Sequence, residues 1–151
     1  MSIKNHVVSL ELAKKLKEAG WKKPTFYWVV KYKNGNSEPI LAIDALIKLK
    51  KIVEDDYEVY PAPLATEILE ELPCNNVLHP EFTPERLSND GYIIIPSKRK
   101  MVSLHIYKTA DSSYGVEYCN EIGDKHGTTT GGTLPDALAQ MWLYLKQEKF
   151  I

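Results

Sequence analysis

The sequence predicts a single α+β domain in which a mostly antiparallel sheet is covered by three helices. Three segments show the apolar spacing of amphipathic helices, at Leu10–Ala19, Leu64–Leu72 and Leu134–Lys146. Between them lie an aromatic segment, Thr25–Tyr32, and a C-terminal group of short β-rich segments joined by polar turns. The chain has 151 residues and shows no internal repeat or break in composition, so we expect one domain spanning residues 1–151.

The first helix is expected to start after Ser9 and to stop at Gly20. Serine is a preferred N-cap residue, Glu11 lies in the first turn and lysines follow, as the helix dipole favours. Glycine readily takes the left-handed conformation that ends many helices. The predicted buried face consists of Leu12, Leu16 and Ala19.

The next segment, Thr25–Tyr32, is dense in aromatic and β-branched residues, which favour strands. Asn34-Gly35 follows, and this dipeptide is a strong signal for a hairpin turn. The return segment, Ile40–Ile43, comes after Pro39, which has no backbone N–H and therefore favours an edge or the start of a strand. From Asp44 to Val53 the pattern fits a helix as well as a strand, and both remain open.

The two later helices carry clear boundary signals. Pro63 suits the first position of a helix over Leu64–Leu72, and Pro73 lies just past its end. Thr133 can cap the final helix, with Asp136 three residues later as a short variant of the capping box. The apolar stripes are Leu64, Ile68 and Leu72 for the middle helix, and Leu134, Leu138, Met141, Trp142 and Leu145 for the final one.

Three segments before the final helix are predicted strands: Tyr92–Ile95, Met101–Tyr107 and Tyr114–Cys119. In the second, apolar residues alternate with Ser103, His105 and Tyr107, which indicates one packed and one partly wet face. An antiparallel meander is the simplest arrangement. We expect Thr128–Gly132 to be a flexible approach to the final helix.

Composition excludes several classes of protein. The net charge of −1 gives no basic excess to drive binding to nucleic acid, so we expect no nucleic-acid partner. Lys98-Arg99-Lys100 could contact phosphates, but a solvated turn is the simpler interpretation. No apolar run approaches the ~18 residues of a membrane span. The N-terminus lacks the apolar region of a secretory signal, so we expect a cytoplasmic protein with reduced cysteines and no membrane partner.

No catalytic motif is present, and we expect no enzyme activity, no cofactor and no metal. The best metal hypothesis would join Cys74, His79, Cys119 and His126, but their spacing lacks the paired-ligand signature of zinc fingers.

Ser103 or a cysteine with His105 could supply a nucleophile and a base, although alternation with apolar residues more often marks a solvent face. The Thr130–Thr133 segment could bind an anion, but Asp136 already uses the positive end of that helix. Glu54-Asp55-Asp56 lacks the pattern of a calcium loop.

Aromatic residues are the remaining functional signal. They crowd the Thr25–Tyr32 segment and flank the proline-rich segment that begins at Pro61. Because neighbouring strand residues point to opposite faces, some aromatic surface stays available to a partner unless helices cover both faces. The residues predicted to bind a protein partner are Tyr27, Trp28, Tyr57 and Tyr60, with burial under the helices as the alternative.

Two segments, Tyr60–Pro73 and Gly132–Leu145, together resemble a group of small uncharacterised proteins encoded by bacteriophages and prophages. The Leu10–Trp21 helix followed by the aromatic strand fits the same arrangement. The resemblance implies a phage or prophage origin and the cytoplasm of a bacterial host, and it carries no activity to transfer. We therefore expect a non-enzymatic accessory protein that acts through protein–protein contacts. The alternative is a small enzyme or metal-binding protein that uses His105, Cys119 or the dispersed Cys/His set.

Overall fold

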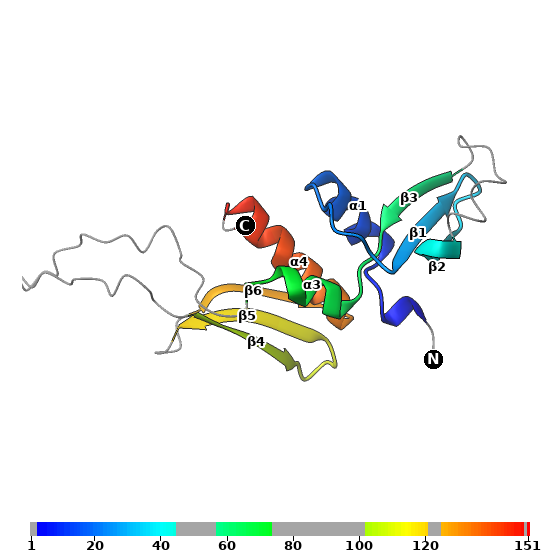
Figure 1. The fold of residues 1–151 in the computed structure, drawn as a ribbon. Coiled ribbons are helices and arrows are strands. Elements are labelled where there is room, and N and C mark those ends of the chain that lie inside the picture. Colours follow the sequence, from blue (N-terminus) through cyan, green and yellow to red (C-terminus); the bar gives the residue numbers. More distant parts are fainter. Residues whose placement is uncertain (1–2, 45–56, 74–101, 121–124, 150) are drawn as a thin grey trace, which may run out of the picture.

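The computed structural model describes residues 3–44, 57–73, 102–120, 125–149 and 151. They form two three-stranded antiparallel sheets with helices packed between them (Figure 1). The predicted α+β class and antiparallel pairing are confirmed. The aromatic strand and the C-terminal meander do not share one sheet, however, since each belongs to its own sheet.

The first sheet contains β1 (Tyr27–Tyr32), β2 (Ser37–Leu41) and β3 (Tyr57–Pro61), in the order β2-β1-β3. The predicted hairpin turn is confirmed: Gly35 has a φ of +85°, and Asn34 Oδ1 accepts from the Asn36 N–H at 3.0 Å. Pro39 lies on β2, which is an edge strand of this sheet within the described residues. Residues 45–56, which hold most of the segment left open, are outside the described residues.

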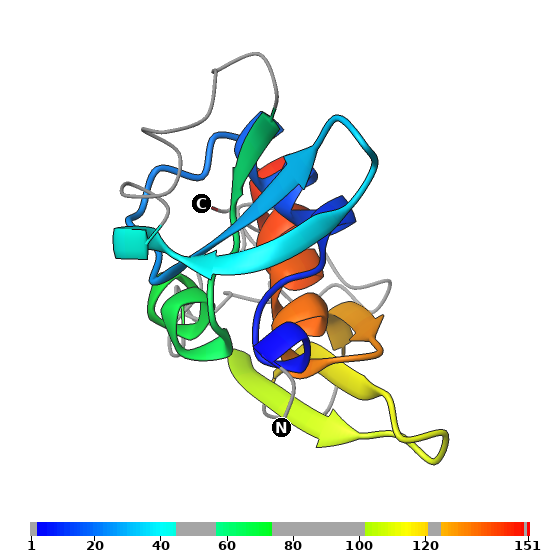
Figure 2. The same cartoon turned by 90° about the vertical axis from the view of Figure 1, so that its right-hand side faces the viewer.

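The second sheet is a meander of β4 (Val102–Lys108), β5 (Tyr114–Asn120) and β6 (Lys125–Gly131). Two of the predicted strands are confirmed, and the third, at residues 92–95, lies outside the described residues. Figure 2 shows this sheet and the first sheet at opposite ends of the molecule.

The prediction of a flexible approach at Thr128–Gly132 is wrong, because residues 125–131 form β6. Its threonines are β-branched and pair with β5, and Thr129 Oγ1 donates to the Ala137 carbonyl at 3.0 Å. At Gly131 an added Cβ would lie 2.5 Å from the Ala137 nitrogen. The glycine at position 131 therefore allows the strand to pack closely on the final helix, and it does not mark a flexible segment.

The helical elements bounded within the described segments are η1 (Ile3–Asn5), α1 (Leu10–Glu18), α3 (Ala65–Glu71) and α4 (Leu134–Gln147). Residues 42–44, directly after β2, are helical as well. Ser9 is the N-cap residue of α1, as predicted, but its side chain makes no capping bond. Its backbone N–H instead donates to Asp136 Oδ1 of α4 at 2.8 Å. At the other end, Gly20 has the expected positive φ of +88°, and the Trp21 N–H donates to the Leu16 carbonyl at 2.9 Å.

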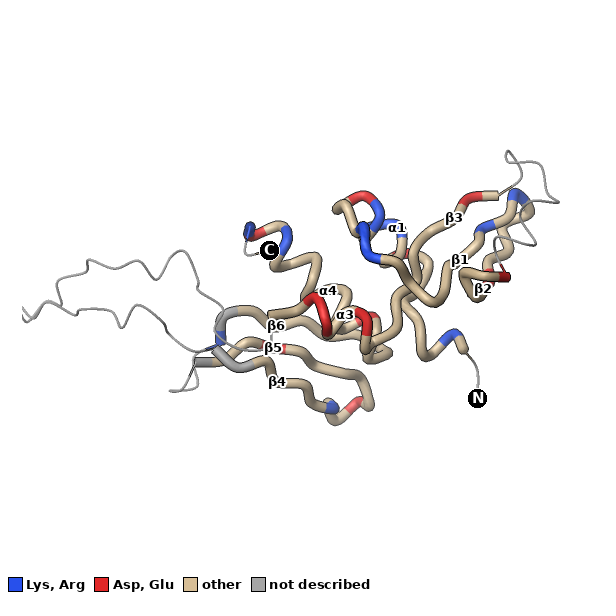
Figure 3. The backbone as a smooth tube through the Cα atoms, viewed as in Figure 1, with Lys and Arg blue, Asp and Glu red and all other residues tan. Residues whose placement is uncertain are grey.

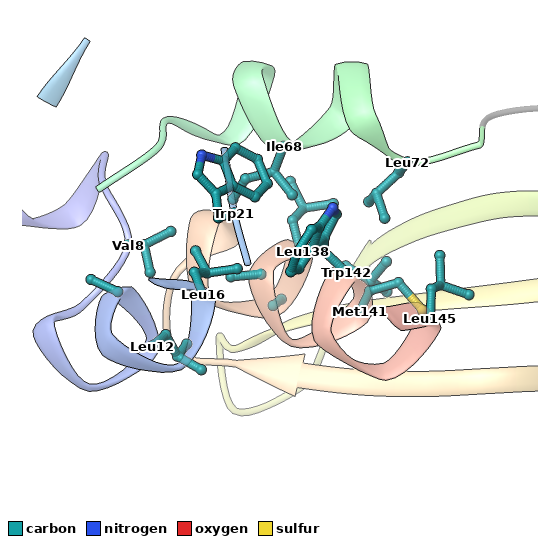
Figure 4. Close-up of a cluster of buried hydrophobic side chains, with 14 of the residues drawn as sticks. Val8, Leu12, Leu16, Trp21, Ile68, Leu72, Leu138, Met141, Trp142 and Leu145 are labelled. Atoms are coloured by element: carbon teal, nitrogen blue, oxygen red, sulfur yellow. The ribbon is translucent and has the colours of Figure 1, made fainter. Parts of the chain in front are cut away.

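Helix α4 lies at the centre of the main core (Figure 4). One side contacts β5 and β6, and the other contacts α1 and α3. The rings of Trp21 and Trp142 meet edge to face, with centroids 5.1 Å apart. The stripe predicted for α4 is buried except at Leu134, which is half-buried against the same core. The labelled members of this core are Val8, Leu12, Leu16, Trp21, Ile68, Leu72, Leu138, Met141, Trp142 and Leu145.

The start of α3 differs from the prediction. Leu64 is the N-cap residue, so Pro63 precedes the helix instead of occupying its first position. The reason is a side chain: Glu67 Oε2 accepts from the Leu64 N–H at 2.7 Å and fixes the cap there. The other oxygen, Glu67 Oε1, accepts from the Phe26 N–H at 2.9 Å, just before β1. Glu67 therefore joins α3 to the first sheet, and Figure 3 shows α3 as an acidic helix.

We expect Glu67→Ala to lower the free energy of unfolding by about 2 kcal/mol, since two backbone N–H groups lose a charged acceptor. Glu67→Gln should cost less, because its amide oxygen still accepts one of the two bonds. Urea unfolding measures both changes. Glu70→Ala, an exposed glutamate on the same helix, is the control, and a Glu67→Ala change no larger than that of the control would contradict this role.

Candidate functional site

The two faces of the second sheet differ in chemistry. The face toward α4 carries Leu104, Val116 and Tyr118, which pack into or against the main core. Successive residues of a strand point to opposite faces. The outer face therefore carries His105, Tyr107, Glu117 and Cys119. The polar face predicted for β4 lies on the side away from α4.

Glu117 is the centre of this outer face and is only 8% exposed. The Lys125 ammonium lies 2.9 Å from Oε2, and the Tyr107 hydroxyl donates to the same oxygen at 3.3 Å. The Cys119 thiol donates to the other oxygen, Oε1, at 3.4 Å. The buried carboxylate thus has a donor on each oxygen, as a buried charge requires.

These contacts set the ionisation of the group. The pKa of the Glu117 carboxyl lies below its usual value, chiefly because Lys125 donates to it, while burial acts in the opposite direction. The pKa of Lys125 is raised by the same hydrogen bond. Burial, followed by the hydrogen bond to Glu117, raises the pKa of the Cys119 thiol. At neutral pH the carboxylate and the ammonium are therefore charged and the thiol is protonated.

Gly115 makes room for Tyr107. The two residues are paired across β4 and β5, and a Cβ at Gly115 would lie 2.4 Å from Cζ of the tyrosine ring. The ring therefore lies over the glycine, and its hydroxyl extends toward Glu117. Any larger residue at 115 would displace the ring from this position.

His105 completes the group. It is paired with Glu117 across the two strands, and its side chain is exposed. One ring nitrogen of His105, one carboxylate oxygen of Glu117 and Cys119 Sγ all lie within 4.8 Å of one another. We call these three residues the outer-face cluster.

Sequence reasoning named Cys119 as a candidate nucleophile or metal ligand and His105 as a candidate base, and it missed Glu117, Lys125 and the role of Tyr107. The available signal was the spacing of Glu117 and Cys119, two residues apart on one strand. Pairing with His105 depends on the register of β4 and β5, which the sequence does not display. In the other predicted sets, Cys74, His79, Lys98-Arg99-Lys100 and Glu54-Asp55-Asp56 lie outside the described residues.

Three of the four predicted partner-binding residues are half-buried. Tyr27 packs against the cluster of Val7, Val29 and Ala62, and Tyr57 against Val30 and Ile40. Tyr60 packs against the main core. The ammonium groups of Lys14 and Lys17 lie 5.4 and 5.1 Å from the centroid of the Tyr60 ring, so its outer side carries cations.

Trp28, the fourth predicted residue, is 39% exposed. Phe26, two residues earlier, is 66% exposed. Leu41 is also exposed, but it is paired with Tyr27 and therefore lies on the face of the sheet opposite to Trp28. The Ala42 N–H donates to the Phe26 carbonyl at 2.8 Å, so the backbone at Phe26 is hydrogen-bonded to the segment after β2. We call Phe26 and Trp28 the hydrophobic end of the first sheet.

Comparison of the chain with protein-family models, with curated proteins and with solved structures gives no match. Among the described residues, no helix combines the length and the apolar character needed to cross a membrane.

We expect Glu117→Gln to lower the free energy of unfolding at pH 7 by about 1–3 kcal/mol, because Lys125, Tyr107 and Cys119 all lose a charged acceptor that is itself buried. The pKa of Glu117 is depressed in the folded chain, so its carboxylate contributes stability above the unfolded value of about 4.3. That contribution is lost as the pH falls through the folded pKa.

Urea unfolding of wild type and Glu117→Gln across this pH range measures the effect. The two stabilities should converge at acidic pH, while Glu70→Gln should follow wild type throughout. A difference between wild type and Glu117→Gln that stays constant down to the lowest pH would show that the ion pair is not its source.

Proposed function

We propose that this protein is a non-enzymatic accessory protein of a bacteriophage or prophage that acts by binding another protein through the hydrophobic end of its first sheet. The resemblance of Tyr60–Pro73 and Gly132–Leu145 to phage-encoded proteins supports the origin. The observation that carries the binding function is the exposure of two aromatic rings only two residues apart, those of Phe26 and Trp28.

Exposed apolar groups are ordinary when scattered, but neighbouring ones favour association. Burying apolar surface is worth about 25 cal/mol per Å², and aromatic rings bury more surface than most side chains. Aromatic anchors are also common among the residues that dominate binding energy. Phe26 and Trp28 are therefore the proposed anchors.

The backbone at Phe26 is already fixed. Its N–H donates to Glu67 and its carbonyl accepts from Ala42, so the ring projects from a hydrogen-bonded segment. A group held in place before binding loses little conformational entropy on binding. The surface is thus organised to receive a partner.

The proposed partner is an apolar segment of a different protein. The carboxylate that contacts Phe26, that of Glu67, is occupied by two backbone N–H groups, so this surface offers apolar contacts rather than a free charge. The proposed occupant therefore presents aliphatic or aromatic side chains to the hydrophobic end.

A photo-crosslinking amino acid at position 26, incorporated in bacterial host cells, should capture one such protein, whereas the same group at Ile106 should not. Ile106 is also exposed but lies on the second sheet. With the purified partner, Phe26→Ala combined with Trp28→Ala should weaken binding at least about tenfold, measured by calorimetry. Ile106→Ala should bind as wild type.

Two outcomes would overturn this proposal. One is native affinity of the double variant for the captured protein. The other is crosslinking of position 26 only to a second copy of the chain, which would make the surface a self-association site.

A further inference from the structure

We propose that the outer-face cluster of His105, Glu117 and Cys119 binds a divalent cation that prefers thiolate and imidazole ligands, of the Zn²⁺ class. A tetrahedral zinc site with bonds of about 2.0–2.3 Å places its ligand atoms roughly 3.3–3.8 Å apart. Cys119 Sγ and Glu117 Oε1 are already 3.4 Å apart, and all three ligand atoms lie within 4.8 Å of one another. Small side-chain rotations suffice to close the site.

The ligands are held by paired strands rather than by a loop. His105 on β4 is opposite Glu117 on β5, and Cys119 is two residues further along the same face. Sites built on regular elements hold their geometry better than sites on loops. The sheet therefore supplies the spacing that the cation requires.

The ligand set selects the class of cation. Thiolate and imidazole favour Zn²⁺ and related transition metals over Mg²⁺ or Ca²⁺, which prefer oxygen. Three protein ligands leave one of four positions open, as in zinc sites that bind a water or an exogenous ligand. Because His105 is exposed and the other two residues are buried, the open position is on the solvent side.

The ion pair with Lys125 is compatible with the cation. The Cys119 thiol uses Oε1 of Glu117, whereas Lys125 and Tyr107 both use Oε2. The cation would replace the thiol proton between Sγ and Oε1, and this proton is released to solvent. Lys125 and Tyr107 would stay on Oε2 and orient the carboxylate, as outer partners of metal ligands commonly do.

Most of the charge of the cation is compensated by its ligands. A thiolate and a carboxylate together carry two negative charges, and with Lys125 retained the loaded cluster has one net positive charge next to its open, solvent-facing position. Without the cation, the same cluster holds a neutral thiol and a carboxylate paired with Lys125. The Glu117 carboxylate and the sulfur of Cys119 therefore have polar partners both with and without the cation.

Cobalt(II) is the spectroscopic probe for this site. In the full chain without a histidine tag, and with Cys74→Ser to leave Cys119 as its single thiol, Co²⁺ should bind at one equivalent. The complex should show a thiolate-to-cobalt charge-transfer band and the visible bands of a tetrahedral ion. Zn²⁺ should displace the cobalt and abolish both.

His105→Ala should weaken binding of Co²⁺ and Zn²⁺ by about 100-fold or more, because loss of an outer partner alone typically costs 10–100-fold. His6→Ala, a change at an exposed histidine on the N-terminal segment, is the matched control and should bind as wild type. Cys119→Ser should abolish the charge-transfer band. Since Cys119 is buried and that variant could fail to fold, the exposed His105 gives the independent test.

Absence of a thiolate-to-cobalt band in the wild-type sequence would overturn the proposal. An unchanged affinity of His105→Ala would do the same, because the cation would then be held by other residues. Neither result bears on partner binding by the hydrophobic end, which lies on the other sheet.

Discussion

The burial of α4 is the constraint on which the rest of the structure depends. A sheet must bury its apolar face against another element, and here two small sheets stand at opposite ends of the molecule. Helix α4 packs on β5 and β6 with one side and on α1 and α3 with the other, while α1 in turn contacts β3. The contact between Trp21 and Trp142 lies at this junction. One helix thereby gives the second sheet, α1 and α3 a common core, against which Tyr60 of β3 also packs.

Carboxylates then form hydrogen bonds that join segments beyond the contacts of the apolar core. Asp136 at the start of α4 accepts the backbone N–H of Ser9, and Glu67 at the start of α3 accepts that of Phe26. Both bonds join segments distant in the chain. Glu117 is different, because its donors all come from side chains on its own sheet. The first two carboxylates organise the fold, whereas the third organises a polar surface that the core does not require.

The two proposed sites therefore belong to separate parts of the structure. The hydrophobic end depends on the β1–β2 hairpin and on Glu67, and the outer-face cluster depends on the register of β4 and β5. Trp28 could be named from the sequence because an aromatic strand with two faces exposes some of its rings. The sequence could identify His105 and Cys119 as residue types that bind metals or take part in catalysis. It could not show that the buried carboxylate of Glu117 lies beside them.

The sequence by itself determined the α+β class, most helix boundaries and the Asn34-Gly35 hairpin, because caps, turn residues and apolar periodicity act over a few neighbouring residues. It also determined which face of α4 is buried. Only the tertiary structure decided that the strands form two sheets, that Thr128–Gly131 belong to a strand, and that His105 lies opposite Glu117. These features depend on pairing between segments far apart in the chain. The contacts that stabilise these features join distant segments, so no local sequence pattern predicts them.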